Sequence, residues 1–259
     1  MVEDLERAQH AVALRALLYL ACPDAPASAI TATAEAITRL ADERPQEPVA
    51  EATGLGAATA ENARLNLVEA NLKSANLAGA NLAGADLGGA DLSGANLAGA
   101  DMEEADLSGA NLTDTHLVEG HLNGANLTGG NLTGGNLTGA HLRRANLRNA
   151  FLVGAFLTGA DLTGADLRRA HLPRATLAGA NLAGTQLERT ILTDADLTGA
   201  NLAGAVGMGL PMGAIWDRQT RWPAALAAEA KAGSIEVRPG VYRVGRGETP
   251  APARVAVPV

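Results

Sequence analysis

Residues 76–100 read NLAGANLAGADLGGADLSGANLAGA, which is one five-residue unit written five times. The unit continues well beyond this stretch. Leucine occupies every fifth position from Leu67 to Leu202, with Met102 as the single substitute, so 28 units follow one another in register. Such an uninterrupted internal repeat predicts one elongated repeat domain instead of a conventional globular core.

Three further positions of the unit are restricted. The residue two before each leucine is alanine in 21 units, the residue just before it is asparagine in 12 and aspartate in seven, and the residue two after it is glycine in 17. A small residue and a leucine two apart lie on the same side of an extended chain, so both are expected to face inward. The asparagine or aspartate and the two residues after the leucine are expected to face solvent.

A period of five residues fits neither a regular helix nor a plain strand. Five residues advance an α-helix by about 500°, which would spiral the leucines around it, and the side chains of a strand alternate every two residues. The glycine falls at the third position of a four-residue turn, where a type II turn requires a positive φ. Each unit is therefore predicted to be a short extended edge followed by a corner.

Four such corners close a square coil. About 20 residues then make one coil, and the repeat gives about seven coils stacked about 4.8 Å apart, a rod about 34 Å long. Hydrogen bonds between coils are expected to satisfy the main chain around an interior of leucine and alanine. Because that interior is narrow, a leucine in place of Ala95 or Ala160 is expected to overpack it.

The unit resembles the A-[DN]-L-x-G repeat of the pentapeptide-repeat family, as in Ala80-Asn81-Leu82-Ala83-Gly84. The resemblance covers a little over half of the chain. It implies an all-β solenoid, a right-handed quadrilateral β-helix, and the handedness rests on the resemblance alone. We expect an α-helical extension and linker at residues 1–60, the β-helix at 61–205, and a capping segment with a hairpin and a tail at 206–259.

The N-terminal region has a helical pattern in place of the repeat. Two amphipathic helices are predicted from apolar residues at helical spacing, which are Leu5, Val12, Leu17 and Leu20 for the first and Ile30, Ala34, Ile37 and Leu40 for the second. A similar helical lead-in is found in many bacterial proteins of the family that the repeat resembles. The helices are expected to cover the open N-terminal end of the solenoid or part of one face, because a solenoid needs a cap on its exposed edge.

Beyond the repeat, the string Asp217-Arg-Gln-Thr220-Arg-Trp222-Pro223 resembles the D-x-x-T-x-W-P closure that follows the last coil in many members of the same family. The resemblance implies that these residues and Trp216 cover the last leucine layer, with partner binding as the alternative for the tryptophans. A short helix is predicted at 224–232, a hairpin at 234–244, and a frayed tail at 247–259.

Composition narrows the classes of function. Aromatic residues make up 2% of the 259 residues, and 20 Lys and Arg against 28 Asp and Glu give a net charge of −8, which excludes a broadly basic nucleic-acid binder. The single cysteine, Cys22, excludes an internal disulfide and a cysteine-cluster zinc site. No stretch approaches the roughly 18 apolar residues of a membrane-spanning helix. We therefore expect a cytoplasmic protein without membrane contact.

No chemistry-bearing motif stands out from the repeat. No spacing brings a nucleophile and a base together, and no phosphate-binding loop or cofactor motif is present, so we expect no enzyme activity and no cofactor. Stepping by 20 residues places two imidazoles and two carboxylates in one column, formed by Asp101, His121, His141 and Asp161. Metal binding is the minor interpretation of this column, because side chains on adjacent coils stack in any solenoid.

Two sets of surface residues are candidates for an interaction surface. The apolar set is Phe151, His171 and Ile191 in one column, with Phe156 on the adjacent face. A partner interface and packing against the N-terminal helices both explain it. The acidic set lies in the earlier coils and consists of Asp86, Asp91, Asp101, Glu103, Glu104 and Asp106, whereas arginines gather in the later coils.

Two functions compete on this pattern. The favoured one is a non-catalytic scaffold that offers a rigid surface to a protein partner in a bacterial cytoplasm. The alternative, implied by characterised members of the family, is a DNA mimic that occupies DNA gyrase and protects it from quinolone-type inhibitors. A 34 Å length of DNA carries about 20 charges, whereas the repeat has 14 acids offset by eight bases. No direct nucleic-acid binding is expected, and the resemblance implies a homodimer through the C-terminal end.

Overall fold

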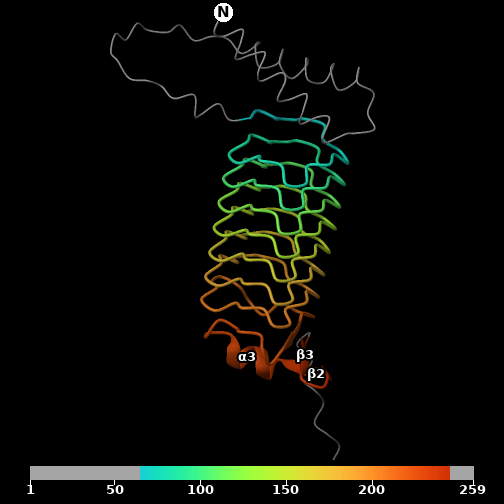
Figure 1. The fold of residues 1–259 in the computed structure, drawn as a ribbon. Coiled ribbons are helices and arrows are strands. Elements are labelled where there is room, and N and C mark those ends of the chain that lie inside the picture. The colour runs from blue at the N-terminus through green and yellow to red at the C-terminus, as the bar shows by residue number, and fades with distance from the viewer. Residues whose placement is uncertain (1–64, 246–259) are drawn as a thin grey trace, which may run out of the picture.

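A computed structural model describes residues 65–245, and within them the chain winds into a stack of coils (Figure 1). Parallel bridges join residues twenty positions apart, for example Asp101 to His121 and His121 to His141. Each five-residue unit contributes one bridge residue and one turn. The predicted coil of four units is therefore confirmed, and each strand of this β-helix is only one bridge long. The two helices and the linker expected within 1–60 lie outside the described residues.

The main chain is satisfied by a continuous ladder between coils. The N–H of Leu122 donates to the carbonyl of His141 at 2.7 Å, and the N–H of His141 donates to the carbonyl of Gly120 at 2.9 Å. Turn residues take part as well, since the N–H of Gly124 donates to the carbonyl of Arg143 at 2.9 Å. Every coil thus holds its neighbours in a fixed register along all four faces.

The corner of each unit has the predicted positive φ. Gly124 has a φ of 69°, and the N–H of Ala125 closes the turn on the carbonyl of Leu122 at 3.1 Å. Eleven residues other than glycine adopt positive φ at this same position, among them Glu104 at 56° and Arg144 at 55°. Their side chains stand at the corners of the rod, where a glycine would leave bare backbone.

The interior is filled by the leucines and by the small residues that precede them by two. Both are completely buried over most of the rod, as Leu142 and Ala140 are. Two threonines replace the alanine at buried positions and satisfy their hydroxyls on the main chain: Thr115 donates to the carbonyl of Leu92 at 3.1 Å, and Thr185 to that of Leu182 at 2.8 Å. The rod therefore has a uniform aliphatic core without an unpaired buried hydroxyl at these two positions.

The twenty-residue spacing of the bridges is interrupted once near the end of the rod. Asp196 pairs with Ile215, nineteen positions away, whereas Asn201 pairs with Arg221 at the usual twenty. The strand β1 (Ile215–Asp217) begins at this offset. It continues the last coils and also pairs antiparallel with a strand from further along the chain.

A small sheet and a helix follow the rod. The helix α3 (Ala227–Ala232) precedes β2 (Ser234–Arg238) and β3 (Val241–Val244), which form an antiparallel hairpin across Pro239 and Gly240. The strands lie in the order β1-β3-β2. Figure 1 places α3, β2 and β3 at the C-terminal end of the stack. The part of the chain described by the structure, residues 65–245, contains no helix with the length and hydropathy of a membrane span.

Candidate functional site

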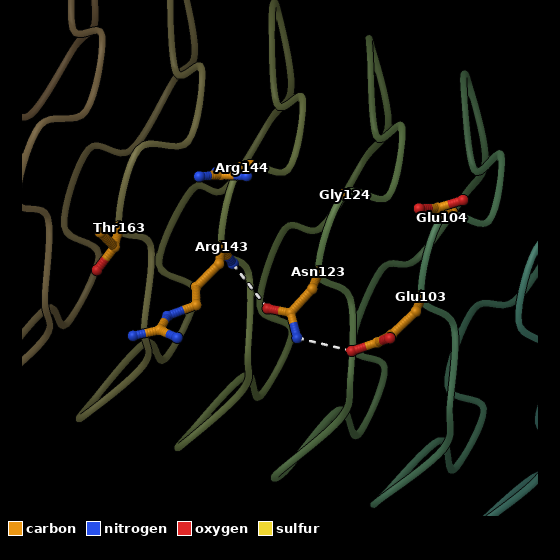
Figure 2. Close-up of a pocket in the computed structure, with 7 residues that line it drawn as sticks. All are labelled: Glu103, Glu104, Asn123, Gly124, Arg143, Arg144 and Thr163. Atoms are coloured by element: carbon orange, nitrogen blue, oxygen red, sulfur yellow. Dashed lines mark hydrogen bonds between the residues drawn. The ribbon is translucent and has the colours of Figure 1, made fainter.

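One face of the rod carries charges of both signs around a groove. The row of bridge residues on this face contains His121 and His141. The groove has a volume of about 630 Å³ and lies beside this row (Figure 2). We call it the charged groove, and the residues that line it are Glu103, Glu104, Asn123, Gly124, Arg143, Arg144 and Thr163.

A chain of hydrogen bonds fixes one side of the charged groove. The Asn123 side-chain amide donates to Oε1 of Glu103 at 2.8 Å, and its carbonyl oxygen accepts from the backbone N–H of Arg143 at 3.1 Å. The Nε of Arg143 donates in turn to Oδ2 of Asp161 at 2.7 Å. Four successive coils are tied together in this way, and Glu103 and Arg143 are held at a set separation.

The other side is formed by corner residues. Glu104 and Arg144 occupy the third turn position on coils that flank the coil of Gly124, and Figure 2 shows the gap between their side chains. A Cβ on Gly124 would come within 3.5 Å of Cγ of Glu104. The absence of a side chain at Gly124 therefore leaves the floor of the groove open between an acid and a base.

Asp161 is ionised in this setting. Burial tends to raise the pKa of its carboxyl, but the hydroxyl and N–H of Thr163 and the Arg143 guanidinium together outweigh burial and hold the pKa below its ordinary value. Its negative charge orients Arg143 along the groove. The arrangement can bind opposite charges, and its residues do not combine a nucleophile with a general base.

The histidine pair beside the groove is a stack. The rings of His121 and His141 have centroids 5.0 Å apart and planes inclined by 18°. Among residues 65–245, no group of three or more His, Cys, Asp or Glu side chains is arranged to hold a metal ion. The column of Asp101, His121, His141 and Asp161 therefore carries no argument for a metal.

The six acids singled out in the sequence are distributed over three faces of the rod. Asp86 and Asp106 are bridge partners on one face, and Asp91 begins the next unit on a second face. Glu103 and Glu104 line the charged groove on a third face, where Asp101 belongs to the histidine row. A continuous acidic stripe is not formed by these residues.

The apolar candidates are brought together by the coil spacing. Phe151, His171 and Ile191 are successive bridge partners in one row, and the rings of Phe151 and His171 lie 5.2 Å apart. Phe151 is 44% exposed and Ile191 40%, while Phe156, across a corner, is 50% exposed. Val153 adds to this face at 38%, and sequence columns built only on the residue before each leucine missed it.

At the other end, the aromatic residues cluster around Trp216. Its ring packs edge-on against Trp222 at 5.8 Å and stacks with Tyr242 at 4.7 Å between centroids. Its Nε1 donates to Oγ of Ser234 at 2.9 Å. Sequence reasoning did not find Tyr242, because only the pairing of β3 with β1 brings it to Trp216.

Polar groups join this cluster to the last coils. The hydroxyl of Thr220 donates to the carbonyl of Leu197 at 2.9 Å, and Asp217 accepts from the N–H of Gly199 at 2.9 Å. Burial tends to raise the pKa of Asp217, but the hydrogen bonds from Gly199, Thr220 and Gln219 outweigh it and lower the pKa. Asp217 is therefore a charged acceptor for main-chain groups of both the rod and its own turn.

Comparison with known proteins shows which family the repeat matches. A family described as pentapeptide repeats matches in eight copies, over residues 70–109, 105–144, 140–177 and 170–206. No curated protein matches the sequence. Among solved structures, a pentapeptide repeat protein from the thylakoid lumen of Arabidopsis thaliana is 34% identical over 33% of this chain and 64% of its own, with a TM-score of 0.31.

Two further solved structures align over more of the chain. HetL, a pentapeptide repeat protein involved in heterocyst differentiation regulation in the cyanobacterium Nostoc, is 34% identical over 55% of this chain and 82% of its own, with a TM-score of 0.23. QnrB1, a plasmid-mediated fluoroquinolone resistance protein, is 19% identical over 54% of this chain and 72% of its own, with a TM-score of 0.37. The chain thus spans less than two thirds of the Arabidopsis protein and more of the other two.

Proposed function

Because this chain belongs to the pentapeptide-repeat family, whose fold is a right-handed β-helix, we propose that it is a non-catalytic scaffold with a rigid surface for a protein partner. We place it in a bacterial cytoplasm, with about seven coils of about 20 residues each. The observation that carries the proposal is the charged groove, in which acids and arginines are held by hydrogen bonds between coils.

The groove indicates the kind of partner. Glu104 and Arg144 are two coils apart, which is about 10 Å at the usual strand spacing. A partner segment with a base and an acid at that separation would match both charges, and such complementarity gives specificity and fast association. The backbone ladder fixes the spacing of these two residues in advance, so little backbone freedom is lost on binding.

The distribution of charge supports the DNA-mimic function less than the scaffold function. Its acids would have to follow one continuous path, as the phosphates of DNA do. The six acids are instead distributed over three faces, and the later coils carry arginines such as Arg169 and Arg189. We keep gyrase protection as an outcome of the test below.

The C-terminal segment has a separate role in this proposal. We propose that Trp216, Asp217, Thr220, Trp222 and Pro223 close the last coil, since Thr220 and Asp217 bond to main-chain groups of the rod. A homodimer through this end is also proposed. It is supported by the edge position of β2, whose Ile235 is 56% exposed.

Exchanging the charges of Glu104 and Arg144 tests whether the charged groove binds a protein partner. Immobilised full-length protein is compared with Glu104→Arg plus Arg144→Glu, using a bacterial lysate. The matched control is Asp114→Arg plus Arg174→Glu, which makes the same exchange at the same turn position on another corner. A protein retained by the wild type and the control, and lost by the groove variant, supports the proposal.

Two results would contradict it. Retention of the same proteins by all three forms would show that the groove does not select a partner. Relief of fluoroquinolone inhibition in a supercoiling assay with purified DNA gyrase, unaffected by the groove exchange, would favour the DNA-mimic function. The assay should span a salt series, because contacts that replace phosphate contacts weaken steeply with salt.

A further inference from the structure

We propose that the apolar face is the docking site of the chain's own N-terminal segment, residues 1–40. The apolar face is the surface formed by Phe151, Val153, His171, Pro173 and Ile191, with Phe156 at its corner. It lies on the face opposite the histidine row that borders the charged groove, because two corners separate the two rows. The inference does not depend on the function proposed for the groove.

The apolar face exposes large apolar side chains to solvent. Phe151 and Phe156 are 44% and 50% exposed, and they are the only phenylalanines of the chain. Val153 and Ile191 extend the same surface at 38% and 40%. Large apolar side chains that gather at solvent on an otherwise polar rod mark a surface that another segment covers.

Arginines border the apolar face. We call the corner that precedes it the arginine edge, formed by Arg148, Arg168, Arg169 and Arg189. Arg168 donates from Nε to Asp166 at 2.8 Å, and NH1 of Arg148 lies 3.9 Å from the same carboxylate. Within residues 65–245, Arg169 and Arg189 form no ion pair.

Counting both corners of the apolar face gives a net positive charge. Arg174 lies on the corner that follows the face. Glu188 and Asp194 are the carboxylates on the two corners, and Asp166 is the carboxylate that Arg168 and Arg148 approach. Five arginines thus oppose three carboxylates, a net charge of +2. The segment that covers the face should therefore be apolar on one side and acidic at its margins.

The chain supplies such a segment. Residues 1–40 contain three arginines (7, 15, 39) against five acids (3, 4, 6, 24, 35), a net charge of −2. Within residues 1–40, the apolar residues recur at the spacing of two amphipathic helices. The sign of the charge and the apolar stripe both complement the apolar face and its arginine edge.

The residues that connect the docking segment to the rod are long enough to reach the apolar face. Successive bridges from Asn71 reach Phe151 after four coils and Ile191 after six, about 19 to 29 Å along the rod. Residues 41–64 could span about 80 Å when extended. Tethering also raises the local concentration of the segment to the millimolar range, which favours docking within one chain over docking between copies.

The single cysteine of the chain allows a direct test. Cys22 lies in the proposed docking segment, so one spin label there can be paired with a second on the rod. Thr193→Cys places the second label on the apolar face. Ala183→Cys is the matched control, because it follows a leucine in the same way but lies on the opposite side. Double electron–electron resonance on the full chain should give a shorter and narrower distance to 193 than to 183.

Substitutions then identify the contacts. Phe151→Ser with Phe156→Ser, and separately Arg169→Glu with Arg189→Glu, should broaden the 22–193 distance. Either pair should also speed tryptic cleavage after Arg15 by about tenfold or more, the effect expected when central contacts are lost. Arg143→Glu with Arg144→Glu, at the charged groove, should change neither quantity. Circular dichroism of each variant verifies that the rod remains folded.

Two outcomes would overturn the proposal. Broad and similar distances from Cys22 to 193 and 183, unchanged by the substitutions, would show that the segment does not dock on this face. A short 22–193 distance that disappears when labelled protein is diluted with unlabelled protein would show docking between two copies. A short distance that survives dilution supports docking within the chain.

Discussion

The rod and the segment that follows it both bury apolar side chains, but they use different residue types. Along the rod, identical coils bury leucine and alanine, and the ladder of backbone hydrogen bonds repeats with each coil. After Arg221 the stacked bridges stop, and Trp216, Trp222 and Tyr242 pack together there. A repeating core therefore needs small, uniform side chains, whereas the surface at its end needs large ones.

The largest predicted loss of stability comes from a substitution at the C-terminal end of the rod. Trp216→Ala should lower the free energy of unfolding by about 3–5 kcal/mol, because it empties the centre of the aromatic cluster. Chemical denaturation measures this change. A loss well below 1 kcal/mol would mean that the last coil is closed without Trp216. Tyr242→Phe is the control, since it keeps the ring that stacks on Trp216.

The interior of the rod should respond to added volume. Ala160→Leu should lower the free energy of unfolding by about 1–3 kcal/mol, because Ala160 is completely buried in the core and a larger side chain there would overpack it. Ala178→Leu adds the same volume at a position that faces solvent and should change little. Denaturation midpoints of the two variants measure the comparison. Equal stabilities would show that the rod interior adapts as a loosely packed core does.

A smaller effect is expected at the corners. Arg174 has a φ of 59°, and Gly159 a φ of 67° with no atom within 4 Å of an added Cβ. Arg174→Gly should stabilise the rod and Gly159→Ala should destabilise it, each by about 1 kcal/mol or less, because glycine adopts positive φ without steric cost. Thermal unfolding checks the two signs. A destabilising Arg174→Gly would mean that contacts of the arginine outweigh its backbone strain.

The smallest predicted effect is the loss of stability at low pH. The Arg168 side chain lowers the pKa of Asp166 more than burial raises it. Because the pKa is lower in the folded state, the stabilisation is complete above about pH 4 and is lost as the pH falls through the folded-state value. Stability should be flat near neutral pH and decline under acid, with a shallower decline in Asp166→Asn. Partial exposure of the pair keeps the effect small.

Most of the rod could be predicted from its sequence because local rules and packing agree at every unit. The leucine, the small residue and the turn glycine each have one acceptable place, and the bridges at twenty residues follow. The positive φ of Arg144 and Glu104 could not be foreseen from propensity. At those corners the ladder on both sides imposes the conformation, and the local cost is overridden.

The surfaces were harder to predict. Column spacing brought Phe151, His171 and Ile191 together correctly, because it depends only on the coil length. The charged groove was missed, since its shape depends on Gly124 lying between longer corner residues on neighbouring coils. Tyr242 was missed for a different reason. Its contact with Trp216 arises from strand pairing over more than twenty residues, and a local pattern carries no signal for it.

The twenty-residue spacing of the bridges makes chain length equivalent to rotation about the rod axis. Insertion of one unit of five residues between Leu87 and Asp91 would turn every later row by a quarter revolution relative to the first coils. The charged groove and the apolar face would turn together, because both lie beyond the insertion. Insertion of four units would restore the original orientation and lengthen the rod by one coil. Natural variation in repeat number can therefore redirect surface features around such a protein while its core stays the same.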